Sequence, residues 1–175
     1  RQSRTRGYRE GLTRIAKQLK TYTLGQDDTA VKAVAAQVLD LQDGSRPETQ
    51  RLLSATLAHA LSPPLTDDAR RFLCKQLSLI GMDNAVEPLA GLLTDSDTCE
   101  PARYALARIP GPAADSALID ALGRAPASCR AGMAQSLAER GTKRAVPVLI
   151  DLLRTGEPVV QDDAAHALGI LGGRD

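Results

Sequence analysis

Aromatic and β-branched residues are scarce in this sequence of 175 residues. It has three Tyr, one Phe and no Trp, and Ala and Leu far outnumber Val and Ile. Sheets draw on β-branched and aromatic side chains, whereas Ala and Leu are strong helix formers. The composition therefore argues against an all-β domain and a Rossmann-like sheet, and it predicts an all-α fold.

Long apolar runs and paired cysteines are also missing. No apolar run approaches the roughly 18 residues that indicate a membrane span. The three cysteines form no CxxC pair and cannot all be disulfide-bonded, so they specify neither a metal site nor an oxidising compartment. Because the chain begins at Arg1 without Met, we expect it to be a processed or excised piece of a longer protein.

The charges nearly balance overall, at a formal net charge of +1, but they are unevenly placed. The first twenty residues hold seven basic side chains against Glu10 alone, which gives this segment a formal charge of +6. The rest of the chain is therefore net acidic, which makes it a poor surface for phosphate backbones. Nucleic acid is an unfavoured partner for the body of the protein.

The second half of the chain repeats itself at offsets of 29, 31 and 31 residues. Such a period indicates a repeat architecture, in which each unit is one supersecondary element. The matched apolar positions are Leu77, Ile80, Leu89 and Leu93, then Leu106, Ile109, Leu118 and Leu122, then Leu137, Leu149 and Leu153.

Each unit is predicted to be two short helices joined by a tight corner. Apolar residues in the first helix recur at helical spacing, as at Leu77 and Ile80. Gly81, Gly141 and Gly172 follow this stripe, where a helix commonly ends in a left-handed residue. The middle unit has Pro at this corner, which ends a helix by breaking its hydrogen-bond ladder.

The second helices are expected over residues 84–93, 113–122 and 143–153, with their stripe facing the first helices. Helices this short are marginal alone in water. Stacking successive pairs would bury one continuous Ala/Leu seam. The predicted fold is therefore an α-α superhelix, a solenoid of about ten short helices.

The pattern is looser upstream, where residues 7–22, 28–41 and 48–61 each carry one apolar helical face. Pro63 and Pro64 break the chain, and Thr66 with Asp67 marks the start of the next helix. We therefore divide one continuous solenoid into capping or degenerate repeats over 1–65 and regular repeats over 66–175, the last of them incomplete.

Three strings carry a family resemblance over residues 66–175. Leu-Ile-Gly-Met-Asp-Asn-Ala-Val-Glu-Pro-Leu (79–89), Arg-Gly-Thr-Lys-Arg-Ala-Val-Pro-Val-Leu (140–149) and Ala-Ala-His-Ala-Leu-Gly-Ile-Leu-Gly (164–172) resemble HEAT repeats of the short, bilin-lyase-like class. More narrowly, Phe-Leu-Cys-Lys-Gln-Leu-Ser-Leu-Ile-Gly (72–81) resembles HEAT segments of exported multidomain proteins from planctomycete-like bacteria. The resemblance implies a protein-binding scaffold, and the narrower one implies export without an assigned activity.

The leading functional hypothesis is a noncatalytic scaffold without a cofactor, which binds a protein or orders flanking domains of the same precursor. The alternative that the resemblance implies is a bilin-lyase-like enzyme subunit that handles a chromophore. The sequence indicates no particular oligomeric state. In the scaffold hypothesis the second helices line a concave face and present three equivalent pairs: Ala90 with Gly91, Ile119 with Asp120, and Ile150 with Asp151.

Each cysteine is interpreted from the residues that occupy its place in the other repeats. Cys74 and Cys129 stand where other units carry small or apolar residues, which predicts burial, whereas Cys99 stands where others carry Arg or Gln, which predicts exposure. A disulfide between Cys99 and Cys129 stays open. Stacked helices lie about 8–10 Å apart, whereas a disulfide needs Cα atoms within about 7 Å.

Catalytic motifs find little support. His166 follows Asp162 and Asp163 at spacings of four and three, but the other imidazole, His59, lies several units away. The two aspartates are instead interpreted as first-turn residues of the last helix, where acidic groups favour the helix dipole. Neither a phosphate-binding glycine loop nor a nucleophile elbow occurs in the sequence.

The basic leader is interpreted as an amphipathic cap with Leu12 and Leu19 facing inward. The alternatives are that it binds an acidic partner, a lipid surface, or nucleic acid with Tyr8 and Tyr22 stacked on bases.

The last helix is followed by no partner helix before Asp175. Its Ala/Leu face is expected to meet another chain, to be closed by further residues, or to form an exposed apolar patch.

Overall fold

A computed structural model describes residues 2–173, with the side chains of all of these except residues 2–6, 8 and 9. Over this range the chain forms ten α-helices and two short 3-10 turns, and no strand. The all-α solenoid predicted from composition and periodicity is confirmed. The elements are α1 (Gln2–Leu19), α2 (Thr29–Leu41), α3 (Pro47–Ala60), α4 (Asp67–Ile80), η1 (Asp83–Ala85), α5 (Val86–Ala90), α6 (Cys99–Arg108), α7 (Pro112–Leu122), α8 (Ala127–Glu139), η2 (Lys143–Ala145), α9 (Val146–Thr155) and α10 (Pro158–Gly172).

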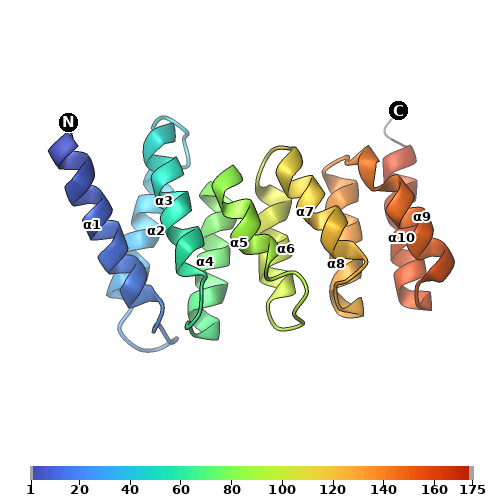
Figure 1. Ribbon diagram of the computed structural model, residues 1–175, viewed down its shortest axis with the longest axis horizontal. Helices are drawn as coiled ribbons and strands as arrows, with labels where there is room; N and C mark the ends of the chain where they lie inside the picture. Colours follow the sequence, from blue (N-terminus) through green and yellow to red (C-terminus); the bar gives the residue numbers. More distant parts are fainter. Residues whose placement is uncertain (1, 174–175) are drawn as a thin grey trace.

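The helices alternate between two layers along one elongated stack (Figure 1). Helices α1, α3, α5, α7 and α9 form the layer in front, here called the B layer, and the even-numbered helices form the A layer behind it. Neighbours within a layer pack side by side, as α4 does on α6, α8 on α10 and α1 on α3. Each helix pair therefore contacts only the pairs beside it, as expected of a solenoid.

Leucines at matched repeat positions form the core between the layers. Fully burying a Leu contributes roughly 1.5–3 kcal/mol, and Ala residues such as Ala105 and Ala114, both 0% exposed, let the helices approach closely. The predicted Ala/Leu seam is confirmed. The matched leucines, each 0% exposed, are Leu77, Leu106 and Leu137 in the A layer and Leu89, Leu118 and Leu149 in the B layer.

Several helix boundaries have local causes, and the sequence predicted them from the capping and proline residues. The Thr66 hydroxyl accepts a 3.2 Å hydrogen bond from the backbone N–H of Ala69, so Thr66 is the N-cap of α4. Asp67 and Asp68 lie in the first turn of that helix, as expected. Helix α6 ends at Arg108, just before Pro110.

The left-handed conformation is confirmed at one of the three predicted glycine corners. Gly141 has a positive φ of 70°, whereas Gly81 ends α4 as predicted but has φ of −57°, and Gly172 lies within α10. Gly81 is needed for space, because a Cβ there would collide with the carbonyl oxygen of Leu77 and lie 2.9 Å from Cδ1 of Ile109. The start of α10 at Pro158 also moves Asp162 and Asp163 out of the first turn, which corrects their predicted place.

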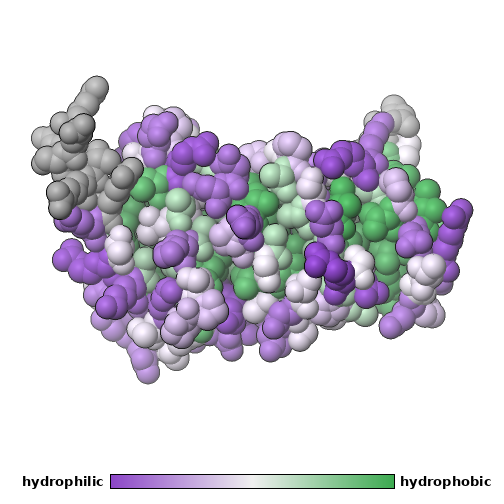
Figure 2. Space-filling view, viewed as in Figure 1, coloured by the Kyte–Doolittle hydropathy of each residue, from purple (hydrophilic) through white to green (hydrophobic). Residues whose placement is uncertain are grey.

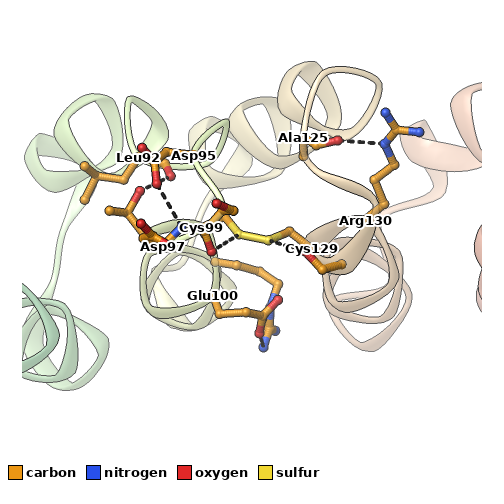
Figure 3. Close-up of a disulfide and its surroundings, with 12 residues drawn as sticks. Leu92, Asp95, Asp97, Cys99, Glu100, Ala125, Cys129 and Arg130 are labelled. Atoms are coloured by element: carbon orange, nitrogen blue, oxygen red, sulfur yellow. Dashed lines mark hydrogen bonds and ion pairs between the residues drawn. A yellow bond between two sulfur atoms is a disulfide. The ribbon is translucent and has the colours of Figure 1, made fainter.

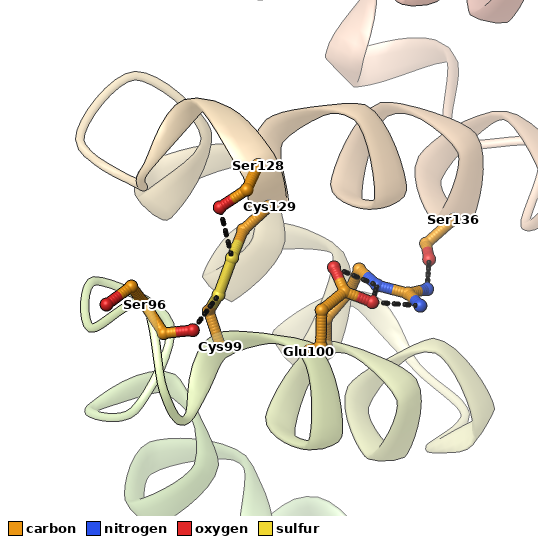
Figure 4. Close-up of polar contacts among 7 residues, drawn as sticks. Ser96, Cys99, Glu100, Ser128, Cys129 and Ser136 are labelled. Carbon is orange, nitrogen blue, oxygen red and sulfur yellow. Dashed lines mark hydrogen bonds and ion pairs between the residues drawn. A yellow bond between two sulfur atoms is a disulfide. The ribbon is translucent and has the colours of Figure 1, made fainter.

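Polar side chains tie successive repeats together. The Ser54 hydroxyl on α3 donates a 2.7 Å hydrogen bond to Oδ1 of Asn84 in the next corner. On the A layer, Arg103 of α6 donates to Oε2 of Glu100 and to Oγ of Ser136 on α8, both at 2.8 Å (Figure 4). These contacts fix the register between neighbouring repeats. Among the described helices, none is long and apolar enough to cross a membrane.

Candidate protein-interaction face

The B layer carries the six residues predicted to form the interaction face. Gly91, Asp120 and Asp151 are exposed, and Ala90, Ile119 and Ile150 are half-buried. Each pair directly follows a fully buried leucine, Leu89, Leu118 or Leu149, and has the same order of a half-buried and then an exposed residue, which agrees with the predicted repeat register. Their role in binding stays a prediction. Figure 2 shows this face, with apolar surface between hydrophilic side chains along much of the stack.

A hollow lies between α1 and α3. It has a volume of about 510 Å³, and small side chains let it form because they leave the space between the two helices unfilled. Its lining comprises Thr13, Ala16, Lys17 and Lys20 from α1 and Ala55, Thr56, His59 and Ala60 from α3. We call it the first hollow.

A second hollow continues the first across α3. It has a volume of about 400 Å³ and lies between the end of α3 and the end of α5. His59 lines both hollows and therefore forms the ridge between them. The other residues that line the second hollow are Ala58, Leu61, Ser62, Pro63, Pro88, Gly91 and Leu92.

The charge of the two hollows has one sign. The charged side chains of the linings are those of Lys17 and Lys20, and no Asp or Glu belongs to either lining. The Lys20 ammonium donates a 2.7 Å hydrogen bond to the carbonyl of Ser62, which holds this cation at the junction of α1 with the α3–α4 loop. Farther along the B layer Asp120 and Asp151 are exposed, together with basic side chains such as Arg144 and Arg154.

Cys99 and Cys129 form a disulfide between α6 and α8, with their Cα atoms 6.3 Å apart (Figure 3). The helix spacing alone argued against this bond. However, Cα atoms lie about 2.3 Å from each helix axis, so atoms on facing sides approach more closely than the axes do. The predicted exposure of Cys99 is wrong, because the residue is 0% exposed at the start of α6.

The remaining cysteine, Cys74, is buried as predicted, at 1% exposed. Burial raises the pKa of its thiol to about 12, against a weaker opposing effect of Arg70. The thiol is therefore held in its protonated, unreactive form at neutral pH. This cysteine is a core residue like its equivalent Ala134, which is 2% exposed.

The two histidines lie far apart, on α3 and α10 (Figure 1). His59 and His166 are both exposed. Across residues 2–173, no group of three or more His, Cys, Asp or Glu side chains could hold a metal ion. The structure therefore does not bring the predicted candidate residues for chemistry into one site.

The basic leader forms α1 and packs as a cap. Leu12 and Leu19 are 3% and 0% exposed, which confirms their predicted inward direction. The side chain of Tyr8 lies outside the described residues. Tyr22 is half-buried with its ring centroid 6.3 Å from that of Phe72, and the alternative that it stacks on bases stays untested.

The last helix leaves part of its surface uncovered. Ala134 and Ala138 of α8 are 2% and 0% exposed, whereas Ala165 and Gly169, their equivalents one repeat later on α10, are exposed. Val159 at the start of α10 is 70% exposed. The expectation of an apolar face at this end holds for the described residues.

The sequence interpretation missed the two hollows. It treated α1 and α3 as degenerate caps and placed the interaction surface on the regular repeats alone. A signal was present, since small residues such as Ala16 and Ala55 lie on α1 and α3 near Lys17 and His59. Only the packing of α1 beside α3 brings these residues together.

The comparison with known protein families gives a match to the C-terminal third of the chain. None of the curated proteins matches the chain significantly. Residues 116–175 match the family model described as HEAT repeats, which places the match on the helix pairs from α7 onward. Over the described residues the chain is an α-solenoid, and its segment 116–175 is similar to HEAT repeats.

Proposed function

We propose that the protein is a noncatalytic scaffold that binds a protein partner, or orders neighbouring domains of a longer chain, through its B layer. The observation that carries this proposal is the B-layer face itself. Five helices present one continuous surface with two adjoining hollows and side chains repeated at matched positions. HEAT repeats supply such extended surfaces generally.

Two further observations favour a scaffold over an enzyme. The imidazoles of His59 and His166 belong to helices from different parts of the stack, so they cannot act together. The Cys74 thiol is buried with a raised pKa, which makes it a poor nucleophile.

A matched pair of charge-reversal variants tests the proposal. The first carries Asp120→Lys and Asp151→Lys on the B layer, and the control carries Asp97→Lys and Asp162→Lys away from that face; all four positions are exposed. A partner is first identified by crosslinking and mass spectrometry. It is then purified, and its affinity for the wild type and for each variant is measured by titration. We expect the B-layer variant to bind at least about tenfold more weakly and the control to bind like the wild type.

Two outcomes would count against the scaffold. Loss of binding only in the control would move the partner away from the B layer. Failure to recover a protein partner, combined with a visible absorption shift on titration with a bilin, would favour a chromophore-handling role instead.

A further inference from the structure

We propose that the two hollows together bind an acidic peptide segment with apolar side chains, laid across α1, α3 and α5. This inference rests on the proposed scaffold function and names the chemistry of one partner. The two hollows are defined above by their linings, and they share His59.

The geometry of the hollows selects an extended ligand. The hollows adjoin each other across α3, so one ligand that fills both must cross the B helices rather than follow one of them. Packed helices lie about 8–10 Å apart. A peptide in polyproline II conformation places every third side chain on one face, about 9 Å apart. Apolar side chains three residues apart would therefore enter the two hollows on either side of His59.

The lining of the hollows selects apolar anchors. Ala16, Ala55 and Ala60 leave space in the first hollow, and Leu61 and Leu92 line the second. Such surfaces stabilise aliphatic side chains by removing them from water. Each hollow has room for at least one branched aliphatic side chain, since both volumes exceed 300 Å³.

The charges around the hollows select an acidic segment. Lys17 is exposed on α1, and Lys20 is held at the edge of the groove by its bond to the Ser62 carbonyl. Because that bond uses one or two of its three hydrogens, the ammonium still has a donor for a ligand carboxylate. No carboxylate in either lining competes for these cations.

Helix-dipole stabilisation explains only part of this arrangement. Lys17 lies in the last turn of α1, where a cation interacts favourably with the helix dipole. That effect accounts for its place along the helix. It does not account for its position beside two adjoining hollows whose linings hold no acidic side chain.

Fluorescence anisotropy with a defined peptide tests the inference on the full chain. The probe is labelled Glu-Leu-Glu-Pro-Leu-Glu, whose leucines are three residues apart. One comparison peptide has lysines in place of the glutamates, and a second has serines in place of the leucines. We expect the acidic probe to bind at least about tenfold more tightly than either, with an affinity that falls as salt rises.

Variants of the groove locate the binding. Lys17→Glu reverses an exposed charge, and Ala55→Phe fills the first hollow; each is expected to weaken the probe at least about fivefold. Arg71→Glu, at an exposed position of α4 in the A layer, is the matched control and should stay within about twofold of the wild type. Circular dichroism shows whether each variant keeps its helices.

The results separate this inference from the broader proposal. Each of four results would overturn the inference: the acidic probe does not bind, it binds no more tightly than the basic peptide, it binds no more tightly than the serine peptide, or Lys17→Glu binds it with wild-type affinity. Displacement of the probe by decanoate at a similar affinity would replace the peptide with a small amphiphile. A partner that fails to bind the variant with Asp120→Lys and Asp151→Lys but still binds Lys17→Glu would give a different result. It would support the scaffold function and contradict peptide binding in the two hollows.

Discussion

Nε of Arg140, which follows α8, donates a 2.5 Å hydrogen bond to Oδ1 of Asp115 on α7. The same guanidinium donates from Nη1 to the carbonyls of Ala107 and Ile109, at 3.0 and 2.7 Å, and from Nη2 to that of Gly111 at 3.0 Å. These carbonyls belong to the end of α6 and the loop after it, and the last carbonyls of a helix have no intrahelical partners. One side chain therefore satisfies the end of one repeat from the next.

Replacing Arg140 should destabilise the stack. Arg140 stands where other repeats carry Ile80, Ile109 and Leu171, and its side chain is 13% exposed. Because Arg140→Ala removes the guanidinium from these carbonyls and leaves Oδ1 of Asp115 with the Thr142 hydroxyl alone as its side-chain donor, we expect the free energy of unfolding to fall by about 2–4 kcal/mol. Urea denaturation measures this loss. Arg154→Ala, at an exposed position of α9, should change stability by less than about 0.5 kcal/mol.

Removing the disulfide should also destabilise the protein. Cys99 and Cys129 are separated by 30 residues, and closing a loop of that length stabilises a fold by about 3–4 kcal/mol in the chain-entropy description. Cys99→Ser with Cys129→Ser should lose that amount in guanidinium denaturation, and a reductant should bring the wild type to the level of the variant. Three titratable thiols in the oxidised, unfolded wild type would contradict the bond.

The Cys74 thiol should resist modification in the folded protein. At pH 8, a thiol with a pKa of about 12 is ionised in only about one molecule in ten thousand, and burial adds a steric barrier. Iodoacetamide followed by mass spectrometry should leave Cys74 unmodified in buffer and modify it fully in guanidinium. Rapid modification without denaturant would show that the helix α4 environment opens readily.

Two glycine substitutions should have opposite effects. In Gly81→Ala the new Cβ would collide with the backbone carbonyl oxygen of Leu77 and lie 2.9 Å from Cδ1 of Ile109, so we expect a loss of about 1–3 kcal/mol. Gly169→Ala adds a methyl group in open space within α10, where Ala is the better helix former by about 1 kcal/mol. Thermal unfolding of both variants measures the contrast. A stabilised Gly81→Ala would contradict the close packing of the α4 corner.

Two exposed carboxyls should titrate at low pH. The Thr29 hydroxyl and its backbone N–H donate to Oδ1 of Asp27, and the Ser45 backbone N–H and hydroxyl do the same for Asp43. These hydrogen bonds lower the pKa of both carboxyls from the usual 3.8. Their stabilising effect is present above the unfolded pKa and is lost as pH falls through the lower folded pKa. Carboxyl-carbon NMR titration should show both midpoints below 3.8. Midpoints at or above 3.8 would contradict these hydrogen bonds to Asp27 and Asp43.

Sequence periodicity could predict the repeats because each stripe position is defined locally. Leu77 and Leu137 lie on the inward face of a helix in any arrangement that buries that face, so spacing alone located them. The cap residue Thr66 and the helix break near Pro110 are likewise set by a few neighbouring residues. The scarcity of aromatic and β-branched residues indicated the fold class in the same way.

The sequence by itself determined that this protein is all-α, that its helices come in repeated pairs, and that Ala and Leu form the seam between them. Tertiary structure alone decided which side chains from different repeats meet. Cys99 with Cys129, Arg140 with Asp115, and Lys17 with His59 are pairs of this kind. The physical reason is that a helical stripe fixes which face is buried, whereas the distance and register between stacked helices depend on the packing of every pair along the stack.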